Sequence, residues 1–361
     1  MAIKSPPNNA AWHVRLLRVS PFRSRCLFVF CCRGKWAGFS LQAYLSSKVK
    51  MSMTASTLQR FNYRLSYSAY RKNKLKLSAY KKLTKQALPL FFRGGDIISF
   101  APLANGVYEP EIKTLIDHLA GSGYADFFID IGANIGLSSC QSGAGFQEIH
   151  MFEPNPNCLS ILKVNAKIAL RHRNYIIHEY GLGPKQEILQ LYVPYDNWGG
   201  AFVKSSSNEY DEALLSSKDG HGKFDLKNYD VLDVAIEPAA ERLAQLFAAL
   251  AAKKLTQGVI KIDVEGFEKL VIDAILSTCP ADFHAFVIFE NWKEGGSLQQ
   301  LHDAHPRIRI YKLTEHKTTW TSAPRWLNSC INFFKGSLST TLEPIQETLT
   351  AGSFVMEIKP A

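Results

Sequence analysis

Acidic side chains are missing from the first quarter of this chain. Residues 1–95 contain 19 Lys and Arg and no Asp or Glu, and the first acid is Asp96. The residues that follow hold 23 basic against 32 acidic side chains, so the net charge of +10 comes entirely from the N-terminal quarter. This asymmetry predicts a boundary near Arg93 between a basic segment and a mildly acidic domain.

Long apolar runs and paired cysteines are also scarce. The nearest approach to a membrane-spanning segment is Cys26–Cys32, seven residues bracketed by Arg25 and Arg33, whereas a spanning helix needs about 18 or more. The seven cysteines form no C-x-x-C pairs at zinc spacing, which disfavours a zinc module and a disulfide framework. We therefore predict a cytoplasmic protein, although cysteines such as Cys140 and Cys158 are equally well explained as small buried hydrophobes.

Two nucleotide-binding fingerprints are absent. The dinucleotide fingerprint G-x-G-x-x-G is not met, because the loop D-I-G-A-N-I-G has Asn134 where the second glycine is required and no third glycine at the helix entry. There is also no G-x-x-x-x-G-K loop to cradle phosphates. A nicotinamide cofactor is therefore disfavoured.

The basic N-terminal quarter divides into two parts. Residues 1–52 show no sustained helical or strand period, and we predict a leader that is disordered or not part of the native product, because Met51 and Met53 offer later start sites. Residues 53–95 are predicted to form a basic aromatic helical extension, with one or two helices over residues 58–88. Three interpretations of these helices stay open: packing on the following domain, peripheral contact with an anionic membrane and, least favoured, binding of nucleic acid.

From Asp96 to the C-terminus, strand-like and helix-like segments alternate, which predicts an α/β domain with a doubly wound, mostly parallel sheet. The predicted strands are residues 127–131, 149–152, 175–180, 259–263, 285–290, 307–313 and 330–334. The predicted helices include residues 112–119, the segment after Pro154, residues 238–255 and residues 267–275. An inserted hairpin is expected at 186–193, followed by a polar loop over 205–228.

Polar residues end the central predicted strands, and a doubly wound sheet binds its ligand at that edge. The first strand ends in Asp130 and the Gly132–Gly136 turn, where missing β-carbons let the backbone approach a ligand closely. Glu153 ends the second strand, 21 residues after Gly132, where a carboxylate can bind the ribose hydroxyls of an adenosine-containing cofactor. The alternative is that Glu153 is a surface carboxylate capping the helix after Pro154.

Three segments, FFIDIGANIG, MFEPNP and VIKIDVEGFE, occur in this order on the predicted strands and resemble the FkbM-type methyltransferases. The resemblance covers roughly Asp96–Phe334 and implies the class I methyltransferase fold, a Rossmann-like seven-stranded sheet with its last strand antiparallel. It also implies S-adenosyl-L-methionine as cofactor, whose sulfonium is better met by a carboxylate such as Asp130 than by a phosphate-binding turn. The expected reaction is O-methylation of a hydroxyl on a sugar, glycolipid or related metabolite.

The same motifs carry the candidate site residues. Cofactor binding is assigned to Asp130, Gly132, Ala133, Asn134, Gly136, Glu153 and Asn155. Proton removal from the acceptor is assigned to Asp263 and Glu265, where the fourth parallel strand ends. For Glu265 an equally good explanation is an acid in the first turn of the following helix, where it complements the helix dipole.

Other polar residues lie near these motifs. Glu290 and His284 are predicted to neighbour the acceptor, whereas His178 is interpreted as structural. Trp292 could stack on a sugar face, but a half-buried aromatic side chain is the commoner explanation. No metal is predicted, because nothing in the spacing demands one, although Asp263, Glu265 and Glu290 could share a cation.

Two further functions stay open. A nucleic-acid methyltransferase would use the basic segment Arg60–Lys85 for phosphate contact, but the N-P-P-[YF] motif expected of enzymes that methylate exocyclic amines is missing. A non-catalytic scaffold would have lost the cofactor, and the intact cofactor motifs argue against it. The predicted partner is a small-molecule or glycan acceptor, held between the sheet edge and residues 195–228. The sequence does not reveal the oligomeric state.

Overall fold

The computed structural model describes residues 67–83, 89–204, 225–291, 297–317, 338–345 and 351–361, with Pro324, Trp326, Leu327 and Ile331 between them. The chain divides into two compact units, Met1–Lys74 and Leu75–Ala361. The predicted leader, residues 1–52, lies outside the described residues. Among the residues that are described, no helix combines the length and the hydrophobicity that crossing a bilayer requires.

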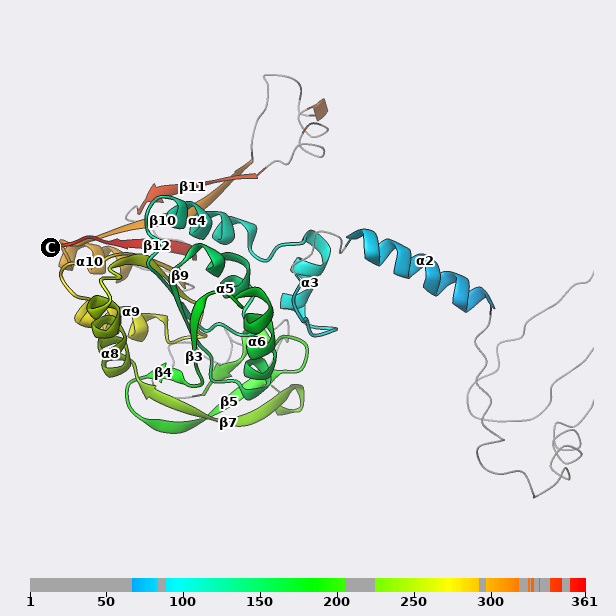
Figure 1. Ribbon diagram of the computed structural model, residues 1–361, viewed down its shortest axis with the longest axis horizontal. Helices are drawn as coiled ribbons and strands as arrows, with labels where there is room; N and C mark the ends of the chain where they lie inside the picture. The colour runs from blue at the N-terminus through cyan, green and yellow to red at the C-terminus, as the bar shows by residue number, and fades with distance from the viewer. Residues whose placement is uncertain are drawn as a thin grey trace, which may run out of the picture. The chain divides into compact units, whose positions relative to one another are not determined.

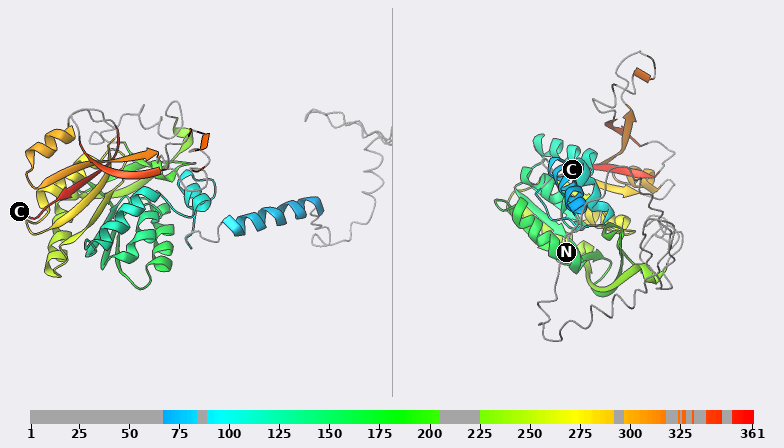
Figure 2. Two further views of the ribbon diagram at one scale, coloured as in Figure 1. Left: turned by 90° about the horizontal axis from the view of Figure 1, so that it is seen from above. Right: turned by 90° about the vertical axis from the view of Figure 1, so that its right-hand side faces the viewer.

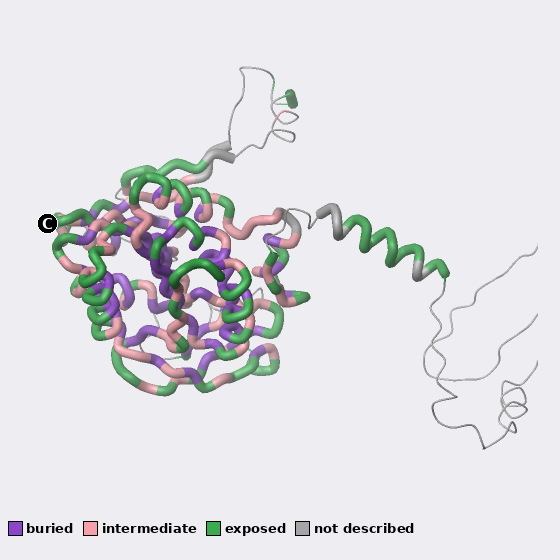
Figure 3. The backbone as a smooth tube through the Cα atoms, viewed as in Figure 1, coloured by how far each residue is buried: buried purple, intermediate pink, exposed green. Residues whose placement is uncertain are grey.

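Helix α2 (Tyr67–Leu83) contains the boundary between the two units. It lies within the segment predicted to be helical, it carries no acid in its first turn, and residues 71–79 are all exposed (Figure 3). The basic side chains of Arg71, Lys72, Lys74 and Lys76 are therefore in contact with solvent. Membrane or nucleic-acid contact through this helix stays a prediction.

An eight-stranded sheet forms the centre of the second unit (Figure 1). Its strand order is β11-β10-β12-β9-β8-β1-β2-β3. In chain order the strands are β1 (Phe127–Ile131), β2 (Glu148–Phe152), β3 (Asn174–His178), β8 (Gln257–Ile262), β9 (His284–Asn291), β10 (Ile308–Lys317), β11 (Leu338–Pro344) and β12 (Gly352–Ile358). Strands β3, β2, β1, β8 and β9 pair in parallel, whereas β12 is antiparallel to both β9 and β10.

The predicted doubly wound sheet with an antiparallel last strand is therefore confirmed, with two differences at its end. An additional strand, β11, pairs with the outer edge of β10 and makes eight strands rather than seven. The last strand predicted at residues 330–334 lies outside the described residues except for Ile331, which is helical, and the antiparallel strand that the structure describes is β12. Both segments are apolar, so composition alone did not distinguish them, but Phe354–Met356 of β12 are fully buried in the sheet.

Helices cover both faces of this sheet (Figure 1, Figure 2). One face carries α4 (Pro110–Gly121), α5 (Leu137–Ser142), the short helix η3 (Gly143–Gly145) and α6 (Pro156–Ala169). The apolar residues of α4 and α6 pack with Phe128 and Val259. The other face carries α8 (Ala239–Ala252), α9 (Glu268–Thr278) and α10 (Ser297–Ala304), which pack with Ile129 and Ile131. Because side chains alternate along a strand, Asp130 points to the same face as Phe128, towards α4 and α5.

A smaller sheet lies between β3 and α8 in the chain. It has the order β4-β7-β5-β6, with β4 (Gly181–Gly183), β5 (Glu187–Pro194), β6 (Phe202–Val203) and β7 (Tyr229–Pro238). The segment 186–193, predicted as an inserted hairpin, forms the single strand β5, and its antiparallel partner is β7, whose Tyr229 pairs with Pro194. Most of the predicted polar loop, residues 205–224, lies outside the described residues. The buried face of this sheet packs on Phe267 at the start of α9, which places the sheet beside the carboxyl ends of the central strands.

The segment that precedes α4 packs on the same domain. Asn165 of α6 accepts a hydrogen bond from the Phe91 N–H (2.7 Å) and donates to the Phe91 carbonyl (3.1 Å). Helix α3 (Ile97–Asn105) is capped by Asp96, which accepts from the Ile98 N–H. Short helices η4 (Trp198–Gly200) and η5 (Leu226–Asn228) complete the described elements.

Candidate active site

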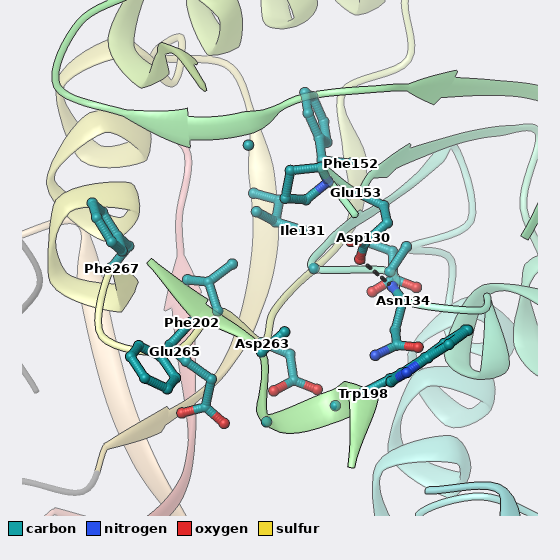
Figure 4. Close-up of a pocket in the computed structure, with 18 of the residues that line it drawn as sticks. Asp130, Ile131, Asn134, Phe152, Glu153, Trp198, Phe202, Asp263, Glu265 and Phe267 are labelled. Carbon is teal, nitrogen blue, oxygen red and sulfur yellow. Dashed lines mark hydrogen bonds between the residues drawn. The ribbon is translucent and has the colours of Figure 1, made fainter. Parts of the chain in front are cut away.

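A cavity of about 300 Å³ lies at the carboxyl edge of β1, β2, β8 and β9 (Figure 4). The ends of these strands supply polar side chains to its wall: Asp130, Glu153, Lys261, Asp263 and Glu290. The smaller sheet and η4 supply apolar ones: Leu182, Leu191, Phe202, Ile236 and Trp198. The cavity therefore has a charged edge on the main sheet and an apolar wall on the inserted one.

The glycine turn after β1 brings backbone to the cavity without side chains. Gly132 has φ +88°, and a β-carbon at this position would lie 1.9 Å from the carbonyl oxygen of Asp263. The N–H groups of Gly132 and Ala133 both donate to the Phe152 carbonyl at 2.9 Å, which ties β1 to β2. Gly136 caps α5 with φ +85°. Only glycine fits at Gly132, because its backbone is left-handed and closely approached from the next strand.

Glu153 is buried beside this turn. Its Oε2 accepts from the Asn134 N–H and its Oε1 from the Asn155 N–H, each at 2.7 Å. Burial raises the pKa of Glu153 to about 7, although the two backbone hydrogen bonds oppose the shift. The helix cap that the sequence allowed for Glu153 belongs instead to Asn155, whose Oδ1 accepts from the Asn157 N–H.

Asn155 has spare hydrogen-bonding capacity next to Glu153. Its side chain is buried, and no partner for its Nδ2 is found among the described residues. A buried amide without a partner is rare, because the group loses its hydrogen bonds to water on folding. Asn155 is not among the residues that line the cavity, so of these two predicted cofactor residues the structure places only Glu153 in the cavity wall.

A buried charged cluster occupies the neighbouring strand ends. Asp130 of β1 is the direct register partner of Lys261 on β8. The Lys261 ammonium lies 2.6 Å from Asp263 Oδ2 and 4.0 Å from Glu109 Oε2. Burial lowers the pKa of Lys261, but the carboxylates of Asp263, Glu109 and Asp130 outweigh it and hold the pKa well above its usual range. One lysine therefore lies among several acids at this edge.

Asp130 is fully enclosed in this cluster. Its Oδ2 accepts from the Ser139 hydroxyl at 2.5 Å, whereas its Oδ1 has no partner among the described residues. Burial raises the pKa of Asp130, and Lys261 opposes the shift. Asp130 also lines the cavity, so its carboxylate lies close enough to influence a cationic ligand there.

Both predicted catalytic residues line the cavity, on different sides of it. In Figure 4, Asp130, Asn134 and Glu153 lie together, Glu265 lies on the opposite side, and Asp263 lies between them. The acid in the first turn of α9 is Glu268, whose Oε2 accepts from the Gly266 N–H at 3.0 Å. Glu265 precedes the helix, so the explanation as a first-turn acid applies to Glu268 instead.

The structure places the other residues that were considered near the acceptor in different parts of the molecule. Glu290 ends β9 and lines the cavity. His284 begins β9 at the opposite edge of the sheet and binds Glu357 at 3.0 Å, so the prediction that it neighbours the acceptor was wrong. Trp292 lies outside the described residues. Among those residues no group of three or more metal-binding side chains is arranged to hold a cation.

Three residues of the charged edge were missed by the sequence analysis: Tyr108, Glu109 and Lys261. Lys261 lies inside the motif VIKIDVEGFE, two residues before Asp263, and the parallel register places it opposite Asp130. That register could have identified it. Tyr108 and Glu109 precede α4, and no local pattern connects them to strand ends more than 20 residues away.

His178 is part of a hydrogen-bonded chain behind the cavity wall. Tyr180 Oη lies 3.2 Å from His178 Nδ1, and His178 Nε2 lies 3.0 Å from His150 Nδ1. His150 Nε2 then lies 2.9 Å from Glu148 Oε1, which also binds Lys253. Because an ionised carboxylate only accepts, each imidazole donates through Nε2 and Tyr180 donates to His178. The structural interpretation of His178 is consistent with this chain.

This chain predicts a pH-dependent contribution to stability. Burial, together with the charges of the neighbouring His150 and Arg242, lowers the pKa of His178 to about 4. Below about pH 6.5 this histidine becomes protonated in the unfolded chain, whereas in the folded protein it stays neutral down to about pH 4. Its contribution to the free energy of unfolding is therefore present above pH 6.5 and is lost as the pH falls towards 4. We expect the stability advantage of wild type over His178→Gln to shrink by about 1 to 2 kcal/mol from pH 7 to pH 5, allowing for the half-buried ring.

Urea unfolding at the two pH values measures this effect. The matched control is His172→Gln, an exposed histidine in the turn before β3, which we expect to leave the pH dependence unchanged. Equal pH dependence of wild type and His178→Gln would show that His178 is not held neutral by the fold.

The strand order, the antiparallel last strand and the ligand-sized cavity at the carboxyl edge define this unit as a class I methyltransferase fold. The family model of the methyltransferase FkbM domain matches residues 130–311, about half of the chain. The chain belongs to this family. No curated protein matches it.

Solved structures with similarity to the chain include three methyltransferases. A methyltransferase FkbM from Methylobacillus flagellatus is 15% identical, with 68% of this chain and 57% of that chain covered and a TM-score of 0.30. An O-methyltransferase from Bacillus cereus, in complex with SAH, is 11% identical over 80% of this chain and 89% of that one, with a TM-score of 0.35. The O-methyltransferase TomG from Streptomyces achromogenes, in complex with SAM, is 10% identical over 79% and 96%, with a TM-score of 0.36.

Proposed function

We propose that this protein is an S-adenosylmethionine-dependent methyltransferase that methylates a hydroxyl on a sugar, glycolipid or related metabolite. The observation that carries the proposal is the buried carboxylate of Glu153 beside the side-chain-free turn at Gly132, in one cavity with Asp263 and Glu265. A carboxylate at the end of the second strand suits ribose hydroxyls, and carboxylates at the end of the fourth suit proton removal.

The residues present fit the cofactor. Gly132 and Ala133 would offer it close backbone contact, and Glu153 would bind the ribose hydroxyls. Bound S-adenosylmethionine would supply a methyl group on a positively charged sulfur. Asp130 lines the same cavity, and its carboxylate would stabilise a cation there.

The acids around Lys261 favour a neutral, hydroxyl-rich acceptor. Asp130, Asp263 and Glu109 surround one ammonium group, so the cavity edge holds more negative than positive charge. Hydroxyl groups donate hydrogen bonds to carboxylates, whereas phosphate groups are repelled by them. This charge supports a glycan over a nucleic acid as the acceptor. The basic surface of α2 is the one observation that favours nucleic acid, and it suits an anionic membrane equally well.

Transfer of a radiolabelled methyl group tests the proposed acceptor class. The full chain is incubated with methyl-labelled S-adenosylmethionine and, in parallel, with neutral glycans, glycolipids or total RNA. We expect label in a glycan or glycolipid fraction, with at least a tenfold loss for Asp263→Asn and none for the exposed control Asp273→Asn. Label in RNA alone would replace the glycan proposal by nucleic-acid methylation. Cofactor binding without transfer to any of these acceptors would favour the scaffold function.

A further inference from the structure

Glu109 has an unusual backbone for a residue at the start of a helix. Its φ of 40° and ψ of 70° place it in the left-handed region, although it is not glycine. It immediately precedes Pro110 at the first turn of α4, and its side chain makes no capping hydrogen bond to that helix. Such conformations persist where the surroundings enforce them, and they concentrate at functional sites.

The surroundings of Glu109 tie it to the cofactor turn. Gln141 of α5, the helix that follows the Gly132–Gly136 turn, donates to the Tyr108 carbonyl at 2.8 Å and accepts from the Tyr108 N–H at 3.2 Å. On the other side, the Glu109 carbonyl accepts the Lys113 N–H, the first helical hydrogen bond of α4. Held at both ends, Glu109 directs its carboxyl group into the cavity wall rather than along α4.

Glu109 has two charged neighbours where β8 ends, Lys261 and Asp263, and their contacts differ. Lys261 lies 2.6 Å from Asp263 Oδ2 but 4.0 Å from Glu109 Oε2, so its direct ion pair is with Asp263. A carboxylate in a direct ion pair gives up proton affinity, because the ammonium group stabilises its charged form. Glu109 Oε2 is buried and has no hydrogen-bond partner among the described residues. Of the two acids, Glu109 is therefore the better proton acceptor.

We propose, on the basis of the proposed function, that Glu109 takes the proton from the acceptor hydroxyl, and that the Lys261–Asp263 pair positions the acceptor and holds the local charge. In that step a bond forms between the methyl carbon and the acceptor oxygen, the sulfur–carbon electron pair stays on sulfur, and the hydroxyl proton moves to Glu109 Oε2. One positive charge is lost at sulfur and one negative charge at Glu109, so the net charge of the site is unchanged.

Charged groups from several elements set the proton affinity of Glu109. Burial raises the pKa of Glu109 to about 7, and Lys261 opposes the shift. The carboxylates of Asp263, Glu290 and Glu111 reinforce it. Burial and the charge of Glu109 raise the pKa of the adjacent Tyr108, and Asp130 acts on Lys261 from β1. Near pH 7 Glu109 is thus present in both forms, which suits a group that must gain and lose a proton in each turnover.

Proton release on binding distinguishes this role from a structural one. A cation next to Glu109 favours its ionised form, whereas a neutral ligand does not. S-adenosylmethionine should therefore displace a proton from Glu109, and S-adenosylhomocysteine, which lacks the sulfonium charge, should not. With a pKa of about 7, about half of Glu109 is protonated at pH 7. Binding of S-adenosylmethionine is therefore expected to release up to about half a proton more than binding of S-adenosylhomocysteine. The ratio of the two affinities should then change about threefold per pH unit.

Calorimetric titration of the full chain in phosphate and in Tris buffer at pH 7 measures this number, because the two buffers differ in ionisation enthalpy. Both ligands carry an ionisable amine, so the informative comparison is between variants. We expect the difference in proton release to disappear in Glu109→Gln, to persist in Glu109→Asp and to persist in the exposed control Glu241→Gln. An unchanged difference in folded Glu109→Gln overturns the proposal for Glu109.

A second measurement covers the case in which Glu109→Gln does not fold. Wild-type protein labelled with ¹³C at its glutamate carboxyl carbons is titrated by NMR from pH 6 to pH 8 with each ligand. We expect one carboxyl that titrates near pH 7 to respond to S-adenosylmethionine and not to S-adenosylhomocysteine, and its absence would overturn the role of Glu109. Failure of both ligands to bind would instead reject the proposed function.

Discussion

Substitution of Gly132 by alanine is expected to abolish cofactor binding and to destabilise the fold by about 3 kcal/mol or more. The added β-carbon would lie 1.9 Å from the Asp263 carbonyl oxygen and 2.8 Å from its carbon, in a left-handed backbone that alanine avoids. Relief of this contact would push β1 and β8 apart where Asp130, Lys261 and Asp263 meet. Thermal unfolding together with titration of S-adenosylmethionine measures both effects.

Gly121→Ala is the matched control for this substitution. Gly121 ends α4, its φ is not positive, and nothing lies within 4 Å of an added β-carbon. We expect wild-type unfolding and wild-type binding for this variant. If Gly132→Ala also behaved as wild type, the close approach of the turn to β8 would not be a feature of the protein in solution.

The second large effect is expected at Glu153. Glu153→Ala should weaken both S-adenosylmethionine and S-adenosylhomocysteine by more than about tenfold, which corresponds to about 1.4 kcal/mol, because both ligands present the same ribose. The alanine also leaves the Asn134 and Asn155 N–H groups without their acceptor, so Glu153→Gln, which retains one carbonyl oxygen, separates ligand contact from loop support. Direct calorimetric titration gives the four affinities.

The pattern across the two ligands makes this test specific. Substitution of Glu153 should lower the affinity for both ligands equally. Substitution of Glu109 should instead change the difference in proton release between the two ligands. Glu179→Gln, an exposed residue that pairs with Lys163, serves as the control and should bind both ligands as wild type does. Unchanged affinity in Glu153→Gln and in folded Glu153→Ala would remove Glu153 from the cofactor site.

Local sequence patterns were sufficient to predict the centre of the sheet and the cofactor turn. The apolar run at 127–131 has the length of a strand buried on both faces, and the structure places β1 over the same residues. The glycine turn and Glu153 follow strands directly, so the position of the strands fixes their place at one edge. Asp263 and Glu265 were found in the same way, because both come directly after β8.

The elements that were missed depend on contacts distant in sequence. Strand β5 pairs with β7 across a long connection, and no local signal in the polar segment between them identifies the partner. Strand β12 lies between β9 and β10 in the sheet. Residues 330–334 are also apolar, so composition alone did not indicate which segment takes this position. Glu109 reaches the charged edge only because Gln141 anchors the chain before α4. Propensity and spacing do not encode such tertiary contacts.

The measurement that tests the central claim most directly is calorimetric titration of S-adenosylmethionine into the 361-residue chain, followed by displacement with S-adenosylhomocysteine. We predict one-to-one binding with a micromolar dissociation constant, about 8 kcal/mol, and full competition between the two ligands. A protein that is folded by circular dichroism and binds neither ligand would contradict the assignment of the cavity at Gly132 and Glu153 as a cofactor site.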